Sequence, residues 1–172
     1  GDEAQSIVTT LPRVGYRLGV PVSRRAVEFL PAASRLQAGG SVPRRPNWSL
    51  ETLLSRNGDN EVWLARHGKT REARVFKFSL AGGGLDGLKR EVTIARLLRE
   101  ALGEREDFVR VLDWDFEQAP YFVECGHAGT SLDRWPDEGP GALARVPVAQ
   151  RLRLFVAAAE AVAAAHGVGV LH

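Results

Sequence analysis

One acidic residue inside an apolar helical stripe limits what this chain can fold into more than any other feature. Residues 85–102, LDGLKREVTIARLLREAL, carry apolar side chains at the spacing of an amphipathic helix. The apolar stripe contains Leu88, Ala95, Leu98 and Leu102. Glu91 falls within the same stripe, and a carboxylate that faces a core is costly unless a cation meets it. The sequence therefore predicts a basic partner for Glu91.

The chain has few lysines, so few of them could be the partner of Glu91. The chain has only three lysines, Lys69, Lys77 and Lys89. Lys69 falls in a predicted turn, and Lys89 falls on the polar side of the helix. Lys77 lies in the predicted strand REARVFKFSL, where alternation places it on the same face as Val75. Two independent periodicities thus predict an ion pair between Lys77 and Glu91. The alternative leaves Lys77 in solvent and Glu91 at the helix flank.

The pattern from Trp48 onward predicts a sheet with a helix packed on it. The predicted strands are 48–55, 61–67, 71–80 and the hairpin 107–125, which turns at Glu117 to Pro120. A second long helix is predicted over Val148 to His166. Three strands, a helix, two strands and then helices is an order typical of an α+β domain.

The first 47 residues have a different character. Two β-prone runs, Ile7 to Leu11 and Tyr16 to Val20, flank a Pro-Arg-Val-Gly turn and predict a hairpin. Residues 21–47 contain four prolines and a glycine pair without a sustained apolar period, which is typical of an interdomain linker. The excess of basic side chains also lies in this part of the chain, which indicates a solvated basic linker or a unit with its own partner.

The composition bounds the class of protein. Apolar residues make up 44% and charged residues 26% of the chain, as in ordinary globular proteins. The single cysteine, Cys125, excludes an internal disulfide and favours a reducing, cytoplasmic compartment. No apolar run of about 20 residues predicts a membrane span. The chain contains no methionine, so we expect it to be a piece of a longer protein that is cut at both ends.

Several segments, in this order and at this spacing, resemble the small lobe of eukaryotic-like serine/threonine protein kinases. RVFK (74–77) stands where that family has Val-Ala-Ile-Lys, and Val62 precedes the lysine as the valine after the glycine-rich loop does. LKRE (88–91) resembles the start of the segment that carries the αC glutamate. The resemblance implies an α+β fold, with an antiparallel five-stranded sheet plus the αC helix.

The resemblance continues into the start of the large lobe and covers about residues 48–172. PYFVECGHAGTSL (120–132) is similar to the last small-lobe strand, the hinge and the first turn beyond it. AAAHGVGVLH (163–172) resembles the helix end before the catalytic loop, with His172 as the structural histidine of that loop. The catalytic Asp and the Mg²⁺ ligands would then follow His172, so we expect this chain by itself to transfer no phosphate.

The resemblance implies roles for individual residues. Lys77 would bind the α- and β-phosphates of ATP, and Glu91 would orient Lys77. Adenine would be enclosed by Val62 and Val75, and it would hydrogen-bond to the backbone of Cys125 and His127. This register places Glu124 at the gatekeeper position, whereas a shift by one residue places Val123 there.

The loop expected to cover the phosphates departs from the family. The expected nucleotide contacts are Leu54, Ser55, Asn57, Gly58 and Asn60. Gly58 is the only glycine among them and is not at a usual place, although glycine is what lets backbone N–H groups approach phosphate. Because Asn tolerates left-handed conformations, we expect Asn57 and Asn60 to preserve a weakened cradle. The rival hypothesis is a loop that excludes nucleotide, as in pseudokinases.

The first segment has a resemblance of its own. Thr9, Gly15, Tyr16, Arg17 and Leu18 are placed as in the closing wing of response-regulator-type winged-helix DNA-binding domains. The recognition helix of such a domain would lie before Gly1. We therefore divide the chain into a partial wing (1–20), a linker (21–47), a kinase small lobe (48–124), and a hinge with the start of the large lobe (125–172).

Three functions follow from these resemblances. The first is a cytoplasmic protein kinase within a transcriptional regulator, with ATP, Mg²⁺, a Ser/Thr protein substrate and DNA as partners. The second is a pseudokinase that senses nucleotide or acts as a scaffold. The third is a DNA-binding regulator whose kinase-like part only contacts partners.

Overall fold

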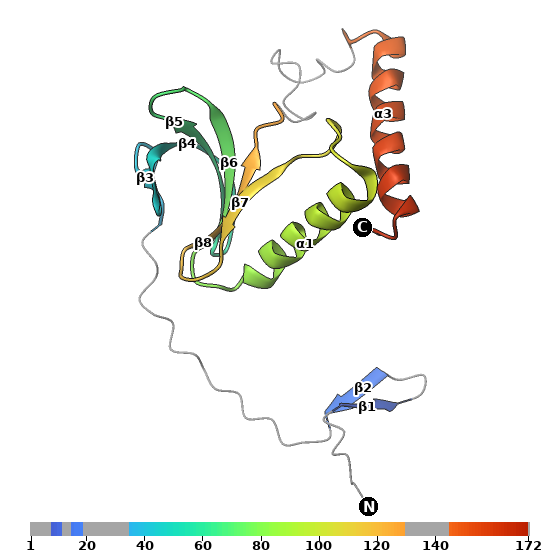
Figure 1. Ribbon diagram of the computed structural model, residues 1–172, viewed down its shortest axis with the longest axis horizontal. Coiled ribbons are helices and arrows are strands. Elements are labelled where there is room, and N and C mark those ends of the chain that lie inside the picture. Colours follow the sequence, from blue (N-terminus) through green and yellow to red (C-terminus); the bar gives the residue numbers. More distant parts are fainter. Residues whose placement is uncertain (1–7, 12–14, 19–34, 130–144, 172) are drawn as a thin grey trace, which may run out of the picture.

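The computed structural model describes residues 8–11, 15–18, 35–129 and 145–171. Within residues 35–129, a curled antiparallel sheet with strand order β3-β4-β5-β6-β8-β7 carries helix α1 on one face (Figure 1). The strands are β3 Ser41–Val42, β4 Arg45–Asn57, β5 Asn60–His67, β6 Ala73–Ser79, β7 Val111–Asp115 and β8 Tyr121–Gly126. The helices are α1 Leu85–Leu102 and α3 Val148–Gly167. The expected α+β class is confirmed.

The sheet has six strands where five were expected. The additional strand, β3, and the first residues of β4 come from the segment 21–47 that was expected to be a linker. A two-residue strand is too short to show a period in the sequence. Backbone hydrogen bonds hold it instead: the Gly39 amide donates to the Leu50 carbonyl and the Leu50 amide to the Gly40 carbonyl, both at 2.8 Å. Gly39 can make this turn because it adopts a positive φ of 83°.

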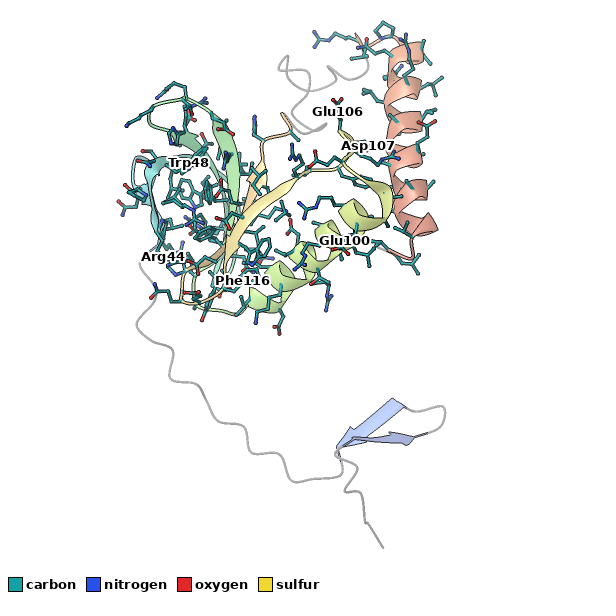
Figure 2. All side chains as sticks on the ribbon, viewed as in Figure 1. Arg44, Trp48, Glu100, Glu106, Asp107 and Phe116 are labelled. Carbon is teal, nitrogen blue, oxygen red and sulfur yellow. The ribbon has the colours of Figure 1, made fainter. Side chains whose placement is uncertain are left out.

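The face of the sheet opposite α1, here called the outer face, holds an aromatic core. Its buried members are Val42, Trp48, Leu50, Trp63, Ala65, Phe76, Phe78, Leu80 and Phe122. Phe76 lies at the centre, with ring centroids 5.9 Å from Trp48, 6.1 Å from Phe78 and 5.7 Å from Phe122. In Figure 2, Trp48 lies among this packed layer of side chains. Leu36 also packs on the layer, so the segment before β3 covers part of the outer face.

Arg44 joins the two edges of the sheet across the outer face. Its Nε donates to Asp115 Oδ2 at 2.6 Å, and its Nη2 donates to the Pro120 carbonyl at 2.6 Å. The guanidinium also lies over the Phe122 ring, 5.4 Å from the ring centroid. Arg44 occupies the β3–β4 turn with a positive φ of 59°, a conformation that is unfavourable for a side chain with a Cβ. These contacts compensate for that strain and close the curled sheet.

Two buried carboxylates belong to the outer face, and both are paired. Glu124 forms ion pairs with Arg74 and, at 3.7 Å, with Arg45. Glu61 accepts from Arg56 Nε at 2.9 Å and from Trp63 Nε1 at 2.8 Å. Because each carboxylate has a cationic partner, its desolvation is compensated.

The opposite face of the sheet, here called the inner face, packs against α1. Leu88 and Val92 are the buried residues of the helix, and they contact Val123 and Cys125 of β8. Ala95, Leu98 and Leu102, expected in the buried stripe, are only half-buried. The helix thus meets the sheet along a line nearer to Val92 than the sequence pattern indicated, which leaves Glu91 beside the contact.

The expected N-terminal hairpin is present as a separate two-stranded sheet of β1 Val8–Leu11 and β2 Gly15–Leu18. Its turn, residues 12–14, lies outside the described residues, as do 19–34, 130–144 and His172. In α3, apolar side chains are exposed along the helix, among them Leu152, Phe155 and Val156. In the described ranges no helix is long and apolar enough to cross a membrane.

Candidate functional site

Lys77 and Glu91 meet on the inner face of the sheet. Lys77 Nζ donates to Glu91 Oε1 at 2.5 Å, and both side chains are about one-third exposed, at 35% and 34%. The ion pair expected from the two periodicities is therefore present. The pair is accessible, so the ammonium group can be reached from solvent without unfolding the sheet.

The strand register explains why Lys77 faces the helix. It pairs with Val62 of β5 on one side and with Val123 of β8 on the other. Its neighbour Phe76 points into the outer aromatic core, so alternation directs Lys77 to the inner face. Glu91 lies less than two turns from the start of α1, on the side that overhangs β6.

The residues expected to enclose adenine also belong to the inner face. Val75 pairs with Cys125 and with Leu64, while Val62 lies opposite Lys77 on β5. Val62 and Val75 are half-buried, whereas Cys125 is buried, and burial raises the pKa of its thiol to about 11. The thiol is therefore protonated at neutral pH, and Cys125 offers an apolar surface to this face.

The described end of the hinge segment lies just beyond the sheet. His127 follows β8 and is exposed. The preceding Gly126 amide donates to the Arg110 carbonyl at 2.9 Å, which ties this end of β8 to the residue before β7.

Glu124 does not lie on the same face as Lys77. It pairs with Phe76 in the ladder, and its carboxylate binds Arg74 on the outer face. A gatekeeper at Glu124 would therefore point away from the site. The register shifted by one residue fits better, because Val123 is buried directly beside Lys77.

The loop expected to cradle phosphate is a tight turn. The β4–β5 ladder continues to the pair Asn57 and Asn60, so only Gly58 and Asp59 form the turn. Gly58 has a positive φ of 61°. Neither asparagine is left-handed, so the expectation that they would replace glycine in this conformation is wrong. Because the two strands pair as far as Asn57 and Asn60, the turn has only two residues, and Gly58 alone supplies its positive φ.

The other expected loop residues are part of β4. Ser55 pairs with Val62 in the ladder, next to a register shift between Leu53 and Ser55 that includes Leu54. Leu54 is half-buried and Ser55 is exposed. Their backbone is thus committed mainly to the sheet, and the turn of Gly58 and Asp59 lies beyond the ladder.

The tip of the turn makes a contact that the sequence reading missed. The Asp59 carboxylate accepts hydrogen bonds from the Gly83 amide at 3.0 Å and the Ala81 amide at 3.3 Å. These amides belong to the segment Ala81–Gly84 that precedes α1. The signal in the sequence is the run of three glycines at 82–84.

A cavity of about 430 Å³ lies beside the ion pair, between α1 and the chain leading into β7. Its lining includes Glu91, Ala95, Phe108, Val111 and Trp114. Neither Lys77 nor the valines expected to enclose adenine contribute to it. Across the described ranges, no three His, Cys, Asp or Glu side chains are grouped as ligands of a metal ion.

No family model and no curated protein matches the sequence. Solved structures do match. A double mutant of the PknI kinase domain of Mycobacterium tuberculosis superposes with a TM-score of 0.51 at 19% identity, covering 80% of this chain and 53% of that one. The unsubstituted PknI kinase domain gives a TM-score of 0.49 at 20% identity, with coverages of 80% and 53%. The apo form of PpkA-294 gives 0.45 at 16% identity, with coverages of 62% and 43%.

The likeness to the first of these domains concerns the fold. The chain spans about half of the length of the PknI kinase domain. Residues 35–129 have the curled antiparallel sheet and packed helix of a protein-kinase small lobe.

Proposed function

We propose that this chain is the ATP-binding part of a serine/threonine protein kinase, which transfers the γ-phosphoryl group of ATP to protein hydroxyls. The observation that carries the proposal is the 2.5 Å ion pair between Lys77 and Glu91 on the accessible face of a small-lobe fold. A lysine held by a helix carboxylate is oriented for phosphate. The apolar side chains of Val62 and Val75 on the same face suit a flat adenine ring.

ATP fits the residues present, whereas Mg²⁺ is assigned no ligand among them. Lys77 supplies the positive charge for the α- and β-phosphates, and Glu91 keeps its side chain extended toward them. In the register with Glu124 at the gatekeeper position, backbone groups of Cys125 and His127 would receive the adenine edge, and the shift that places Val123 there moves these contacts by one residue. Mg²⁺ would neutralise phosphate charge once bound, through groups outside the described residues.

The test is Mg-ATP binding to the protein that contains this chain. We expect Lys77→Met to weaken binding roughly ten- to hundredfold, because a charge-assisted contact to phosphate is lost. Lys89→Met is the matched control, since Lys89 is an exposed lysine on α1 with no expected role. Equal affinity of the Lys77→Met and wild-type proteins would contradict the proposal. Phosphoryl transfer to a Ser/Thr substrate should likewise be lost in Lys77→Met only.

The pseudokinase alternative has one specific observation in its favour. The turn tip carries the carboxylate of Asp59, and asparagines flank the turn where glycines would give phosphate the closest backbone approach. A protein that binds Mg-ATP but transfers phosphate to no protein substrate would support this alternative.

We also propose that the hairpin of β1 and β2 is the wing of a DNA-binding domain in a cytoplasmic transcriptional regulator. The supporting observation is the antiparallel register that pairs Thr9 with Arg17, beside Tyr16 and Leu18 in the same hairpin. A protein that includes the residues before Gly1 should bind duplex DNA with a steep salt dependence. Binding that is insensitive to salt or to removal of that upstream part would contradict the wing assignment.

A further inference from the structure

The tip of the β4–β5 hairpin is attached to the start of α1 through one residue. The Asp59 carbonyl accepts from the Leu80 amide at 2.8 Å, and the Asp59 carboxylate accepts from the Ala81 and Gly83 amides. Three hydrogen bonds thus join the tip to the segment between β6 and α1. Leu85, the first residue of the helix, follows this segment directly.

Two glycines of this segment lie close against side chains of the hairpin tip. A Cβ atom at Gly83 would lie 3.2 Å from both carboxylate oxygens of Asp59. A Cβ atom at Gly84 would clash with Asn60 Oδ1. The glycine run is therefore fitted to the side chains of Asp59 and Asn60. The hairpin tip and the glycine run therefore pack against each other.

The attachment also suits the electrostatics of a helix start. Carboxylates are favourable near the N-terminal end of a helix, where amide groups have no partner within the helix. Helix α1 has no side-chain cap of its own at Gly84, whose amide donates to Ser79 Oγ at 3.0 Å. Asp59, which comes from a different element, satisfies amides just before the helix that would otherwise be open to solvent.

We infer that Asp59 is a positioning residue for the Lys77–Glu91 pair. By fastening the hairpin tip to the start of α1, it makes the loop over the phosphates and the helix that carries Glu91 move as one unit. A phosphate that lifts or lowers the tip therefore moves Glu91 relative to Lys77. The effect on nucleotide rests on the proposed function, whereas the attachment itself does not.

The first arm of the test needs no nucleotide. Asp59→Ala should accelerate amide hydrogen exchange in residues 80–88 about tenfold, because a charged acceptor of two amides is removed. Asp59→Asn keeps one acceptor oxygen and should give an intermediate rate. Gly83→Ala places a methyl group 3.2 Å from the same carboxylate, which must then shift, and it should accelerate exchange less than Asp59→Ala does. Gly87→Ala is the control for an added methyl group: a Cβ atom at Gly87 would have nothing within 4 Å, and because Ala favours the helix this variant should not accelerate exchange.

The second arm measures coupling to the ion pair through Mg-ATP affinity. Glu91→Gln should weaken binding several-fold in the wild-type background and distinctly less in the Asp59→Ala background, since the helix is then no longer held in register with the tip. A structural role alone would leave the two effects equal.

The outcomes separate the two proposals. Unchanged exchange at residues 80–88 in Asp59→Ala would overturn the attachment, whatever the protein binds. Faster exchange with equal effects of Glu91→Gln in both backgrounds would overturn the positioning role. A wild-type protein that binds no Mg-ATP would overturn the proposed function, while the exchange arm would still decide whether Asp59 fastens the tip to the helix.

Discussion

The ion pairs on the two faces of the sheet differ in burial and in number of partners. On the outer face, Glu124 is 2% exposed and is enclosed by Arg74 and Arg45. On the inner face, Lys77 and Glu91 are each about one-third exposed and have a single contact with one another. The comparison teaches that a buried pair is locked by several partners, whereas an accessible pair retains donors that a ligand can use.

The energetic meaning of the two pairs differs accordingly. Removing one partner of a buried pair leaves a charge without compensation in a medium of low polarity. Removing one partner of an accessible pair costs little, because water replaces it. Arg74 reflects the first situation: burial lowers the pKa of its guanidinium, but hydrogen bonds to Glu72 and Glu124 outweigh this and raise the pKa overall.

The largest expected effect comes from the outer aromatic core. Phe76→Ala should reduce the free energy of unfolding by about 3–5 kcal/mol, because the ring is fully buried among three aromatic neighbours. Val75→Ala, the adjacent residue on the inner face, should cost less than half of that, since Val75 is only half-buried. Urea denaturation monitored by tryptophan fluorescence measures both. Equal losses would contradict the distinction between the faces.

We expect Glu124 to matter more for stability and Glu91 to matter more for Mg-ATP binding. Glu124→Ala should lower stability by about 2 kcal/mol, below the cost of breaking a fully buried pair because both arginines are partly exposed. Glu91→Ala should lower it by less than about 1 kcal/mol but weaken Mg-ATP binding more than Glu124→Ala does. Glu72→Ala is a control, since Glu72 is an exposed partner of Arg74. Urea denaturation measures the stability of these variants, and nucleotide titration measures their affinity for Mg-ATP.

The smallest effect concerns the thiol of Cys125 on the inner face. Burial raises its pKa from 9.0 to about 11, so the folded protein retains a proton that the unfolded chain releases first. Stability should therefore be unaffected by this group below about pH 9 and decline as the pH rises toward 11. Alkylation by iodoacetamide at pH 8 should be slow until denaturant is added. Rapid alkylation of the folded protein would show that Cys125 is more accessible than its burial indicates.

Much of this arrangement could be predicted from local pattern. The strand that carries Lys77, the helix that carries Glu91 and their contact all follow from periods of two and 3.6 residues, because each period orients a side chain without knowledge of distant residues. The hairpin of β7 and β8 and the long helix α3 follow from the same signals. The fold class was therefore accessible from the sequence.

The rest depends on contacts between residues far apart in the chain. Arg44 binds residues 71 and 76 positions later, and no periodic pattern reports such a pairing. The backbone conformation of Asn57 and Asn60 is decided by the ladder register, which propensity alone does not give. The contact of Asp59 with the glycine run is likewise a tertiary one, visible beforehand only as an unexplained cluster of glycines.

The position of Arg44 also determines how the preceding chain is tethered. Because Arg44 is fastened to both edges of the sheet and Leu36 packs on the outer core, the chain enters this unit on the outer face. The described chain therefore reaches the sheet on the face opposite Lys77. A shortened chain that begins at Trp48 would lose this anchor together with β3, so a tension applied at its new end would act directly on β4.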